Sequence, residues 1–377
     1  MRRILITLIV CFYILPTFAY TVDITTLGAK GDGITDNTAF IQKAIDDCSA
    51  RKGGTVEIPS GHFLTRTLFL KSNVNLHLHF GAELLGSTDL DSYHKVFPEL
   101  KGKESPALIF ARGVANIAIT GSGTINGQGA HQNFQHGNDS KGGPRRPKII
   151  YFIGCNNVRV QDVTLRNSAY WTQDYEKCNG VIVRGVKVYS HANWNNDGLD
   201  IDSRNVVVSD CYIDCDDDAL CLKSDTDTPC ENVTVTNCVL KSNCNAIKFG
   251  TSSYSGFKNV TISNCTIDRA SEDHIRQWYK NYPWIGTKHK TVVAGIALES
   301  VDGGIIENVS ISDIAMQGVQ TPIFVRLGDR KRTFSKQMSR INDVMISRII
   351  ARSEGKIACS ITGVPASDIK ATVSPAL

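Results

Sequence analysis

Residues 205–213 read NVVVSDCYI, and variants of this segment recur along most of the chain. The copies begin at residues 73, 116, 157, 180, 205, 232, 259, 308 and 343, and residues 368–373 (DIKATV) resemble a tenth, shortened copy. Their second residues in the central region, at 158, 181, 206, 233 and 260, are spaced by 23, 25, 27 and 27. Self-similarity at a period of about 20–50 residues is typical of solenoids and other repeat architectures.

The pattern inside each copy indicates which solenoid forms. Apolar residues occupy the second, fourth, seventh and ninth positions, as in Val206, Val208, Cys211 and Ile213. This is strand alternation, a two-residue bend and strand alternation again, with no helical period. We therefore predict an all-β fold, a parallel β-helix of about ten coils that stack at about 4.8 Å.

The segment before the repeats predicts a cap for the solenoid. Residues 28–33 (GAKGDG) are typical of a turn, and Thr35 or Asp36 can cap a helix that follows. This helix would place four apolar side chains on one face, namely Ile41, Ala44, Ile45 and Cys48. We expect it to cover the open end, which would otherwise expose a sheet edge.

Two recurring residue types are explained by the same fold. Cys211, Cys238 and Cys265 occupy the seventh position, where other copies have Val or Ile. Stacked cysteines lie within disulfide range, so their oxidation state stays open, but we expect thiols packed as small hydrophobic side chains. Asparagines in Asn-x-Ser/Thr sequences also recur at the corners, and we expect stacked amides that cap turns rather than glycans (Asn232, Asn259, Asn264, Asn308).

Composition and the chain ends bound the class of protein. The 377 residues are 42% hydrophobic and 21% charged, with a formal charge of +4, which suits an ordered globular protein and gives no reason to expect a nucleic-acid partner. Residues 1–19 resemble a secretory signal, whose apolar run is shorter than the roughly 20 residues of a membrane span. We expect export to the periplasm or the extracellular space, no membrane span, and one monomeric domain over residues 20–377. The chain stops at SPAL where another coil or cap is expected, so we hypothesise a truncated C-terminus.

Three further groups of side chains have competing explanations. We interpret the basic cluster Arg145, Arg146 and Lys148 as a solvated loop, and a second basic cluster likewise (Arg326, Arg330, Lys331, Arg332). The aromatic residues within 278–284 predict a loop packed on the solenoid, a platform for stacking sugars, or both.

Two acidic clusters carry the chemistry. The first contains Asp197, Asp200 and Asp202, and the second contains Asp214 and residues 216–218. Asp197 and Asp218 are 21 residues apart, so adjacent coils would bring their carboxylates within several ångströms. Such crowding raises one pKa, and glycoside hydrolysis needs one protonated and one ionised carboxyl group.

We assign different roles to these acids. We expect Asp197, Asp217 and Asp218 to be catalytic, whereas four others cap turns or bind calcium (Asp200, Asp202, Asp210, Asp214). Strand alternation would point Asp217 and Asp218 to opposite faces, so both can face one cleft only if the strand begins after them.

These segments resemble glycoside hydrolase family 28, the polygalacturonase family of pectin-degrading enzymes, from about residue 22 to the last coils. The resemblance lies in residues 28–37 (GAKGDGITDN), 145–171, 195–198 (NNDG) and the Asp217–Asp218 pair. It implies a right-handed parallel β-helix and inverting, single-displacement hydrolysis. Asp217 would be the general acid, Asp197 and Asp218 would activate water, and neither a metal nor an organic cofactor would be needed.

Two departures bear on the substrate. Residues 244–246 are Cys-Asn-Ala where the family has Gly-His-Gly, and residues 297–299 are Ala-Leu-Glu where it has Arg-Ile-Lys. Loss of the basic pair removes contacts to galacturonate worth roughly 1.5–3 kcal/mol each. We therefore expect another pectic linkage, rhamnogalacturonan first, since hydrolases of this family that act on it also lack the histidine. The candidate substrate-binding residues are Asn195, Asn245, Lys223, Lys248 and Arg326.

The sequence thus favours an exported inverting glycosidase whose partner is a pectic polysaccharide or oligosaccharide. A β-helical polysaccharide lyase shares the architecture but needs calcium and a basic proton acceptor. A non-catalytic carbohydrate-binding β-helix is the third hypothesis, because the usual basic residues are missing.

Overall fold

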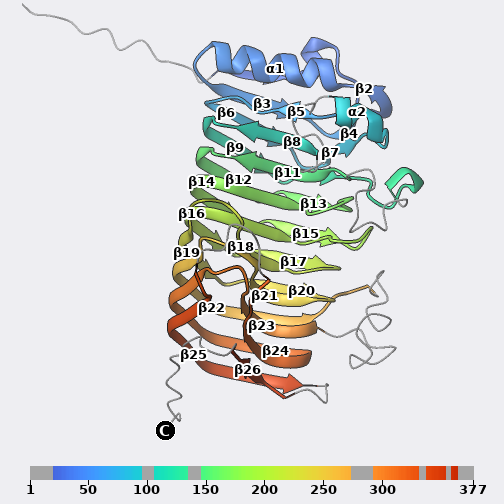
Figure 1. The fold of residues 1–377 in the computed structure, drawn as a ribbon. Helices are drawn as coiled ribbons and strands as arrows, with labels where there is room; N and C mark the ends of the chain where they lie inside the picture. The colour runs from blue at the N-terminus through green and yellow to red at the C-terminus, as the bar shows by residue number, and fades with distance from the viewer. Residues whose placement is uncertain are drawn as a thin grey trace, which may run out of the picture.

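The computed structural model describes residues 20–95, 106–134, 146–272, 292–330, 337–353 and 358–363. The predicted signal segment, the shortened tenth copy and the aromatic cluster lie outside these residues, as do Arg145, Lys331 and Arg332. Three ladders of parallel strands run along the molecule and form one sheet of 26 strands (Figure 1). The chain is a parallel β-helix, as predicted.

The first ladder contains the first half of each repeat. Its strands are β1 (Thr21–Asp23), β3 (Gly54–Ile58), β6 (Val74–Leu78), β9 (Ala115–Gly121), β12 (Asn156–Gln161), β14 (Gln173–Arg184), β16 (Leu199–Ser209), β19 (Cys230–Thr236), β22 (Phe257–Arg269), β24 (Ile305–Leu327) and β25 (Arg340–Ser353). Val181, Val206, Val233 and Val260 are partners in successive strands. The ten strands from β3 to β25 agree with about ten coils.

The second ladder follows the two-residue bend. It contains β2 (Asp32–Asp36), β4 (Gly61–Thr65), β7 (Ala82–Gly86), β10 (Thr124–Asn126), β13 (Thr164–Arg166), β15 (Lys187–Ser190), β17 (Tyr212–Cys215), β20 (Val239–Ser242) and later parts of β22, β24 and β25. In both ladders buried and solvent-facing residues alternate, as in the strand β19. One face of each strand therefore packs in the core while the other meets solvent.

The third ladder differs because side chains on both of its faces are buried. Its strands are β5 (Leu68–Phe69), β8 (Ala107–Arg112), β11 (Lys148–Ile153), the first parts of β14 and β16, β18 (Leu220–Ser224), β21 (Asn245–Ser253), β23 (Val292–Ser300), the last part of β24 and β26 (Ser360–Thr362). Four buried side chains, three of them charged, occupy one row across successive strands: Asp174, Asp200, Cys221 and Lys248. Buried charges need partners, and here Asp174 pairs with Lys148, Asp200 with Lys223 and Lys248 with Glu299.

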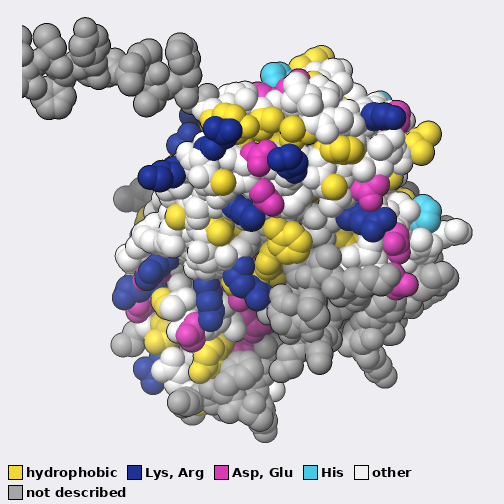
Figure 2. Space-filling view, turned by 90° about the horizontal axis from the view of Figure 1, so that it is seen from above, with side chains coloured by type: hydrophobic (Ala, Val, Ile, Leu, Met, Phe, Trp, Pro, Cys, Tyr) yellow, Lys and Arg dark blue, Asp and Glu magenta, His cyan; other side chains and the backbone are white. Residues whose placement is uncertain are grey.

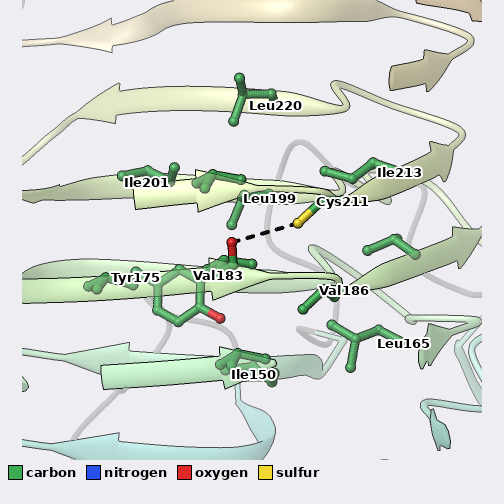
Figure 3. Close-up of a cluster of buried hydrophobic side chains, with 14 of the residues drawn as sticks. Ile150, Leu165, Tyr175, Val183, Val186, Leu199, Ile201, Cys211, Ile213 and Leu220 are labelled. Atoms are coloured by element: carbon green, nitrogen blue, oxygen red, sulfur yellow. Dashed lines mark hydrogen bonds between the residues drawn. The ribbon is translucent and has the colours of Figure 1, made fainter. Parts of the chain in front are cut away.

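The interior is a column of apolar side chains from successive coils. Figure 3 shows Tyr175, Ile201 and Leu220 from the third ladder beside Cys211 from the bend. Val206, Val208, Cys211 and Ile213 are all buried, as the repeat pattern predicted. All eleven cysteines after residue 20 are free thiols, and Cys211 Sγ donates to the carbonyl oxygen of Val183 at 3.7 Å (Figure 3). Nine of the eleven are buried, and Cys211, Cys238 and Cys265 among them pack as small hydrophobic groups, as expected.

Asparagine amides connect the corners of successive coils. Asn232 Nδ2 donates to Asn205 Oδ1 at 3.0 Å, Asn259 Nδ2 to Asn232 Oδ1 at 3.0 Å, and Asn308 Nδ2 to Asn259 Oδ1 at 2.7 Å. Each of these asparagines has a positive φ of 53–56°, and Asn264 shares this conformation at 54°. Asparagine tolerates this conformation better than most residues. The prediction of stacked amides at the corners is confirmed for the first ladder.

Helices cover the N-terminal end. The helix α1 (Thr38–Ala50) buries Ile41, Ala44, Ile45 and Cys48, as predicted. The N-cap residue is Asn37, so the prediction of Thr35 or Asp36 at this position is wrong, although Asp36 Oδ1 accepts from the Thr38 N–H at 3.0 Å. Figure 2 views this end and shows charged side chains interspersed with small groups of hydrophobic ones.

The remaining helices of the described chain are short: η1 (Ile24–Leu27), α2 (Leu90–Lys95) and η3 (Gln132–Phe134). Among the helices that the structure describes, none has the length and apolar character needed to cross a membrane.

Candidate active site

Two turns of adjacent coils bring the acidic clusters together. The strand β16 begins at Leu199 and β18 at Leu220, directly after the turns that carry Asp197 and the Asp217–Asp218 pair. The backbone N–H of Gly198 donates to the Asp218 carbonyl oxygen at 2.8 Å, so the turns themselves are paired. The condition that a strand must begin after Asp217 and Asp218 is met, and both carboxylates face the same site.

The carboxylates lie close to one another. Oxygens of Asp197 and Asp218 lie within 4.8 Å of each other and of Cys221 Sγ, and oxygens of Asp217 and Asp218 lie within 4.8 Å of each other and of Cys244 Sγ. All three aspartates are nearly buried, with 4–8% of their surface exposed. Three acids this close cannot all ionise easily, because like charges in a poorly solvated site repel.

Asp218 is the carboxylate that stays ionised. Its Oδ1 accepts from Asn245 Nδ2 at 2.6 Å and from the Asn245 N–H at 3.2 Å. Burial raises the pKa of Asp218, but the Lys248 and Lys223 ammonium groups and the Asn245 amide outweigh burial, so the pKa falls below its ordinary value.

Asp197 has the opposite tendency. Burial, with the neighbouring charges of Asp200 and Asp217, raises the pKa of Asp197 well above its ordinary value, although Lys223 opposes the shift. Lys223 Nζ lies 3.4 Å from Asp197 Oδ2, while Asp197 Oδ1 is buried and accepts no hydrogen bond from the described protein. The surroundings of Asp197 therefore favour its protonated form more than those of an ordinary carboxyl group do.

Lys223 and Asp200 form an ion pair beside these carboxylates. Lys223 Nζ lies 3.0 Å from Asp200 Oδ1 and 4.2 Å from the centre of the Trp171 ring. Burial raises the pKa of Asp200 to about 7 despite this lysine. Asp200 lies within β16 and is fully buried, so the expectation that it caps a turn is wrong for this residue. Asp202 does cap a turn, since it accepts from the Asp225 N–H at 2.9 Å.

Two basic residues assigned to a solvated loop are part of this site. Arg146 donates to Asn193 Oδ1 at 2.7 Å and to Asn195 Oδ1 at 3.4 Å, and Asn195 Nδ2 in turn donates to Asp217 Oδ2 at 3.4 Å. Lys148 is 5% exposed and pairs with Asp174. The interpretation as a solvated loop is therefore wrong for Arg146 and Lys148. The signal that could have found them is their position in the segment 145–171, which carries the family resemblance.

The sequence of the chain matches that of a known enzyme family. The sequence model of the glycosyl hydrolases family 28 matches residues 48–372. The chain belongs to family 28. It is 31% identical over 225 residues to a probable polygalacturonase of Vitis vinifera, which covers 55% of this chain and 45% of the relative. It is 30% identical over 250 residues to an exo-poly-alpha-D-galacturonosidase of Dickeya chrysanthemi, with 53% and 41% covered.

A solved structure extends the comparison to the fold. The family 28 exopolygalacturonase of Yersinia enterocolitica superposes with a TM-score of 0.72 at 23% identity, covering 93% of this chain and 71% of the relative. At this identity the likeness shows the fold alone. The chain spans less than half the length of the two curated relatives above.

The positions where the chain departs from the family 28 pattern lie beside the acids. Asn245, which the sequence resemblance aligns with the family's histidine, donates its amide to Asp218. Glu299, which the sequence resemblance aligns with the family's lysine, pairs with Lys248 at 2.6 Å between Oε1 and Nζ. Arg326 lies at the outer edge, 54% exposed, with Nη1 4.0 Å from Glu299 Oε2. Lys223 and Lys248 thus adjoin the acids, whereas Arg326 is the predicted anchor that faces solvent.

The charge pattern argues against a metal among these acids. The groups Asp197–Asp218–Cys221 and Asp217–Asp218–Cys244 have ligand atoms close enough for an ion. However, Lys223 and Lys248 already supply positive charge to Asp218, and their ammonium groups would repel a divalent cation.

Proposed function

We propose that this chain is an exported glycoside hydrolase that cleaves pectic polysaccharide by inverting acid/base hydrolysis. The observation that carries the proposal is the close trio Asp197, Asp217 and Asp218, in which the surroundings raise the pKa of Asp197 and lower that of Asp218. Glycoside hydrolysis uses two carboxyl groups in these two protonation states. Membership of family 28 supports the same reaction class.

In this proposal Asp217 protonates the leaving oxygen, and Asp218 with Asp197 positions and activates the water. The lowered pKa of Asp218 suits a base. The raised pKa of Asp197 makes Asp197 the rival for the acid role. Asn195, oriented by Arg146, would position Asp217 through its amide.

The substitution Asp217→Asn tests the assignment. We expect a loss of about 10²–10⁴-fold in the release of reducing ends, because a general acid contributes that much, with an unchanged circular dichroism spectrum. On an oligosaccharide with an activated aryl leaving group, a D217N variant should recover most of its rate, since such a group departs without a proton. D218N, which lacks the base, should stay inactive on both substrates. Undiminished activity of D217N, or recovery by D197N instead, would contradict the role given to Asp217.

For the substrate we propose rhamnogalacturonan rather than homogalacturonan. Lys148, Lys223 and Lys248 each contact a carboxylate of the protein, so in the described part of the site they are already neutralised. A galacturonate carboxylate would have to compete with these internal partners, whereas a neutral sugar such as rhamnose would not. Arg326, exposed at the edge, would bind a galacturonate in the next position along the polymer.

A screen against homogalacturonan, rhamnogalacturonan and their oligomers, with the product anomer determined by NMR, tests this specificity. We expect faster cleavage of rhamnogalacturonan and an inverted anomer as the first product. Faster cleavage of homogalacturonan would contradict the substrate proposal but not the hydrolase. An unsaturated product that absorbs in the ultraviolet would identify a lyase, and binding without turnover a carbohydrate-binding protein.

We also propose that residues 1–19 direct export and are removed, and that the mature chain acts as a monomer. The charged Arg2 and Arg3 and the apolar run that follows support export. Cell fractionation and sequencing of the mature N-terminus test it, and an uncleaved chain in the cytoplasm would overturn it.

A further inference from the structure

A cluster of metal-ligating side chains lies on the outward face of the first ladder, near the capped end and outside the proposed active site. Glu57 is on β3, His77 is on the adjacent strand β6, and His79 directly follows the end of β6 at Leu78. Glu57 and His77 are register partners. His77 and His79 are two residues apart, so strand alternation points both imidazoles to the same side as the Glu57 carboxylate.

The three side chains converge on one point. One candidate ligand atom from each of Glu57, His77 and His79 lies within 4.8 Å of the other two. His79 Nε2 contacts Glu57 Oε2. The ring centres of His77 and His79 are 5.0 Å apart, and the planes of the two rings meet at 87°. Ligands about 2.0–2.1 Å from a tetrahedral zinc ion lie about 3.4 Å from one another, which small rotations of these side chains can reach.

A hydrogen-bonded chain orients His77 for this role. Thr120 Oγ1 donates its proton to Asn75 Oδ1 at 2.9 Å, so at 2.8 Å it accepts from His77 Nδ1. Nδ1 of His77 therefore carries a proton, and the lone pair of Nε2 stays free. A histidine that binds a metal usually donates its second nitrogen to such a partner, which fixes its tautomer and orientation.

We propose that Glu57, His77 and His79 bind a divalent transition-metal ion, with zinc as the first candidate. Two imidazoles and a carboxylate suit zinc better than magnesium or calcium, which prefer all-oxygen ligands. Glu57 and His77 are partly buried and His79 is half exposed, so an ion can enter from solvent and keep water in the remaining position. The ion would join β3 to β6 beside the cap, a stabilising role separate from the hydrolysis proposed above.

A second histidine–glutamate pair provides a matched control. His62 Nδ1 lies 2.7 Å from Glu83 Oε2 on the second ladder, with side-chain exposures of 63% and 22% against 50% and 21% for His79 and Glu57. In the described chain this pair has no third ligand within the same reach. Replacing His62 thus removes a similar ion pair without touching the proposed site.

The experiment titrates tag-free, EDTA-treated full-length protein with Co²⁺, followed by visible d–d absorption, and then displaces Co²⁺ with Zn²⁺. We expect saturable binding whose affinity falls at least tenfold in H77A, H79A and E57Q. T120V, which keeps the shape but removes the partner of His77, should weaken binding by about 10–100-fold. H62A should bind like the unmodified chain.

Thermal unfolding gives an independent readout. Saturating Zn²⁺ should raise the Tm of the unmodified chain and of H62A, because a ligand that binds only the folded state stabilises it, but not that of H77A. Equal affinity of H77A and the unmodified chain, or an equal loss in H62A, would overturn the site. Neither test measures hydrolysis. A negative result would therefore contradict the metal site without contradicting the proposed hydrolase activity.

Discussion

Lys223 lies between Asp197 and Asp200 and over the Trp171 ring, in a site with little access to water. Burial alone would lower the pKa of Lys223, but Asp200, Cys221 and Asp197 raise it well above its ordinary value. The lysine is therefore a fixed positive charge. It balances several acids at once and helps to keep Asp218 ionised.

Replacing Lys223 with methionine tests this balance. We expect a loss of about 3 kcal/mol in the free energy of unfolding, since removing one partner leaves buried charge uncompensated. The acid limb of the pH–rate profile should also move to higher pH, because Asp218 would lose a cation that favours its ionised form. Urea unfolding and kcat/KM against pH measure the two effects.

Lys187, exposed on β15, is the control for this change. K187M should alter neither quantity. A K223M variant whose acid limb stays in place would show that Lys223 has only a structural role.

Asn245 and Glu299, which the sequence resemblance aligns with a histidine and a lysine of the family, have partners of their own. Asn245 donates to Asp218, so an amide takes the place of an imidazole without adding charge. Glu299 neutralises Lys248 instead of adding to it. Both changes make the site less favourable for a polyanion, which is the physical basis of the proposed specificity.

Among the elements, the asparagine corners of the first ladder show how one residue type serves many coils. Asn232 and Asn259 each donate to the preceding coil and accept from the following one, while their backbones adopt a positive φ. The repeat therefore needs asparagine for two reasons, the conformation and the hydrogen bonds.

Two substitutions at Asn232 separate these reasons. N232G keeps the φ of 56° without strain but loses the amide bonds, which contribute about 0.5–1.5 kcal/mol each. N232A loses the same bonds and adds about 1–2 kcal/mol of backbone strain. We expect chemical denaturation to rank unmodified, N232G and N232A in falling stability. Equal stability of the two variants would mean that conformation contributes little at this corner.

Across the molecule, the buried acids make stability depend on pH. Burial raises the pKa of Asp202 to about 8, although the Asp225 N–H opposes it, and burial raises that of Asp200 to about 7. Both values lie above the ordinary 3.8, so the folded state holds these protons more tightly than the unfolded state. The contribution of Asp200 and Asp202 to the free energy of unfolding is most favourable below about pH 4, and it is lost as the pH rises through 7 to 8.

The variant D202N should therefore gain stability relative to the unmodified chain as the pH rises from 5 to 9, because asparagine stays neutral. Thermal unfolding at several pH values measures this difference. D32N is the control of opposite sign. Hydrogen bonds from Thr35 and Ile34 lower the pKa of Asp32 to about 2, so the stability that its carboxylate contributes is already complete at pH 5. The stability difference for D32N should therefore stay constant from pH 5 to 9. A difference for D202N that stays constant with pH would contradict the raised pKa.

Much of the architecture follows from local patterns. Strand alternation and the repeat spacing predicted the β-helix, the buried positions such as Cys211, the asparagine corners and the face of α1 that packs on the core. They also predicted that Asp197, Asp217 and Asp218 would be close, and the structure confirms that proximity. These features could be predicted because each depends on neighbours along the chain or one repeat away.

Other features depend on how different coils meet, and only the folded structure showed them. Arg146 reaches Asn195, and Asp200 reaches Lys223, across segments that no periodic pattern relates. The third ladder buries its outward face, so acids and lysines that pattern alone assigns to solvent or to turns become partners. The sequence alone does not distinguish a charged side chain in water from one that pairs with a buried counter-ion. The two differ in desolvation, and the desolvation of a side chain depends on how the coils assemble around it.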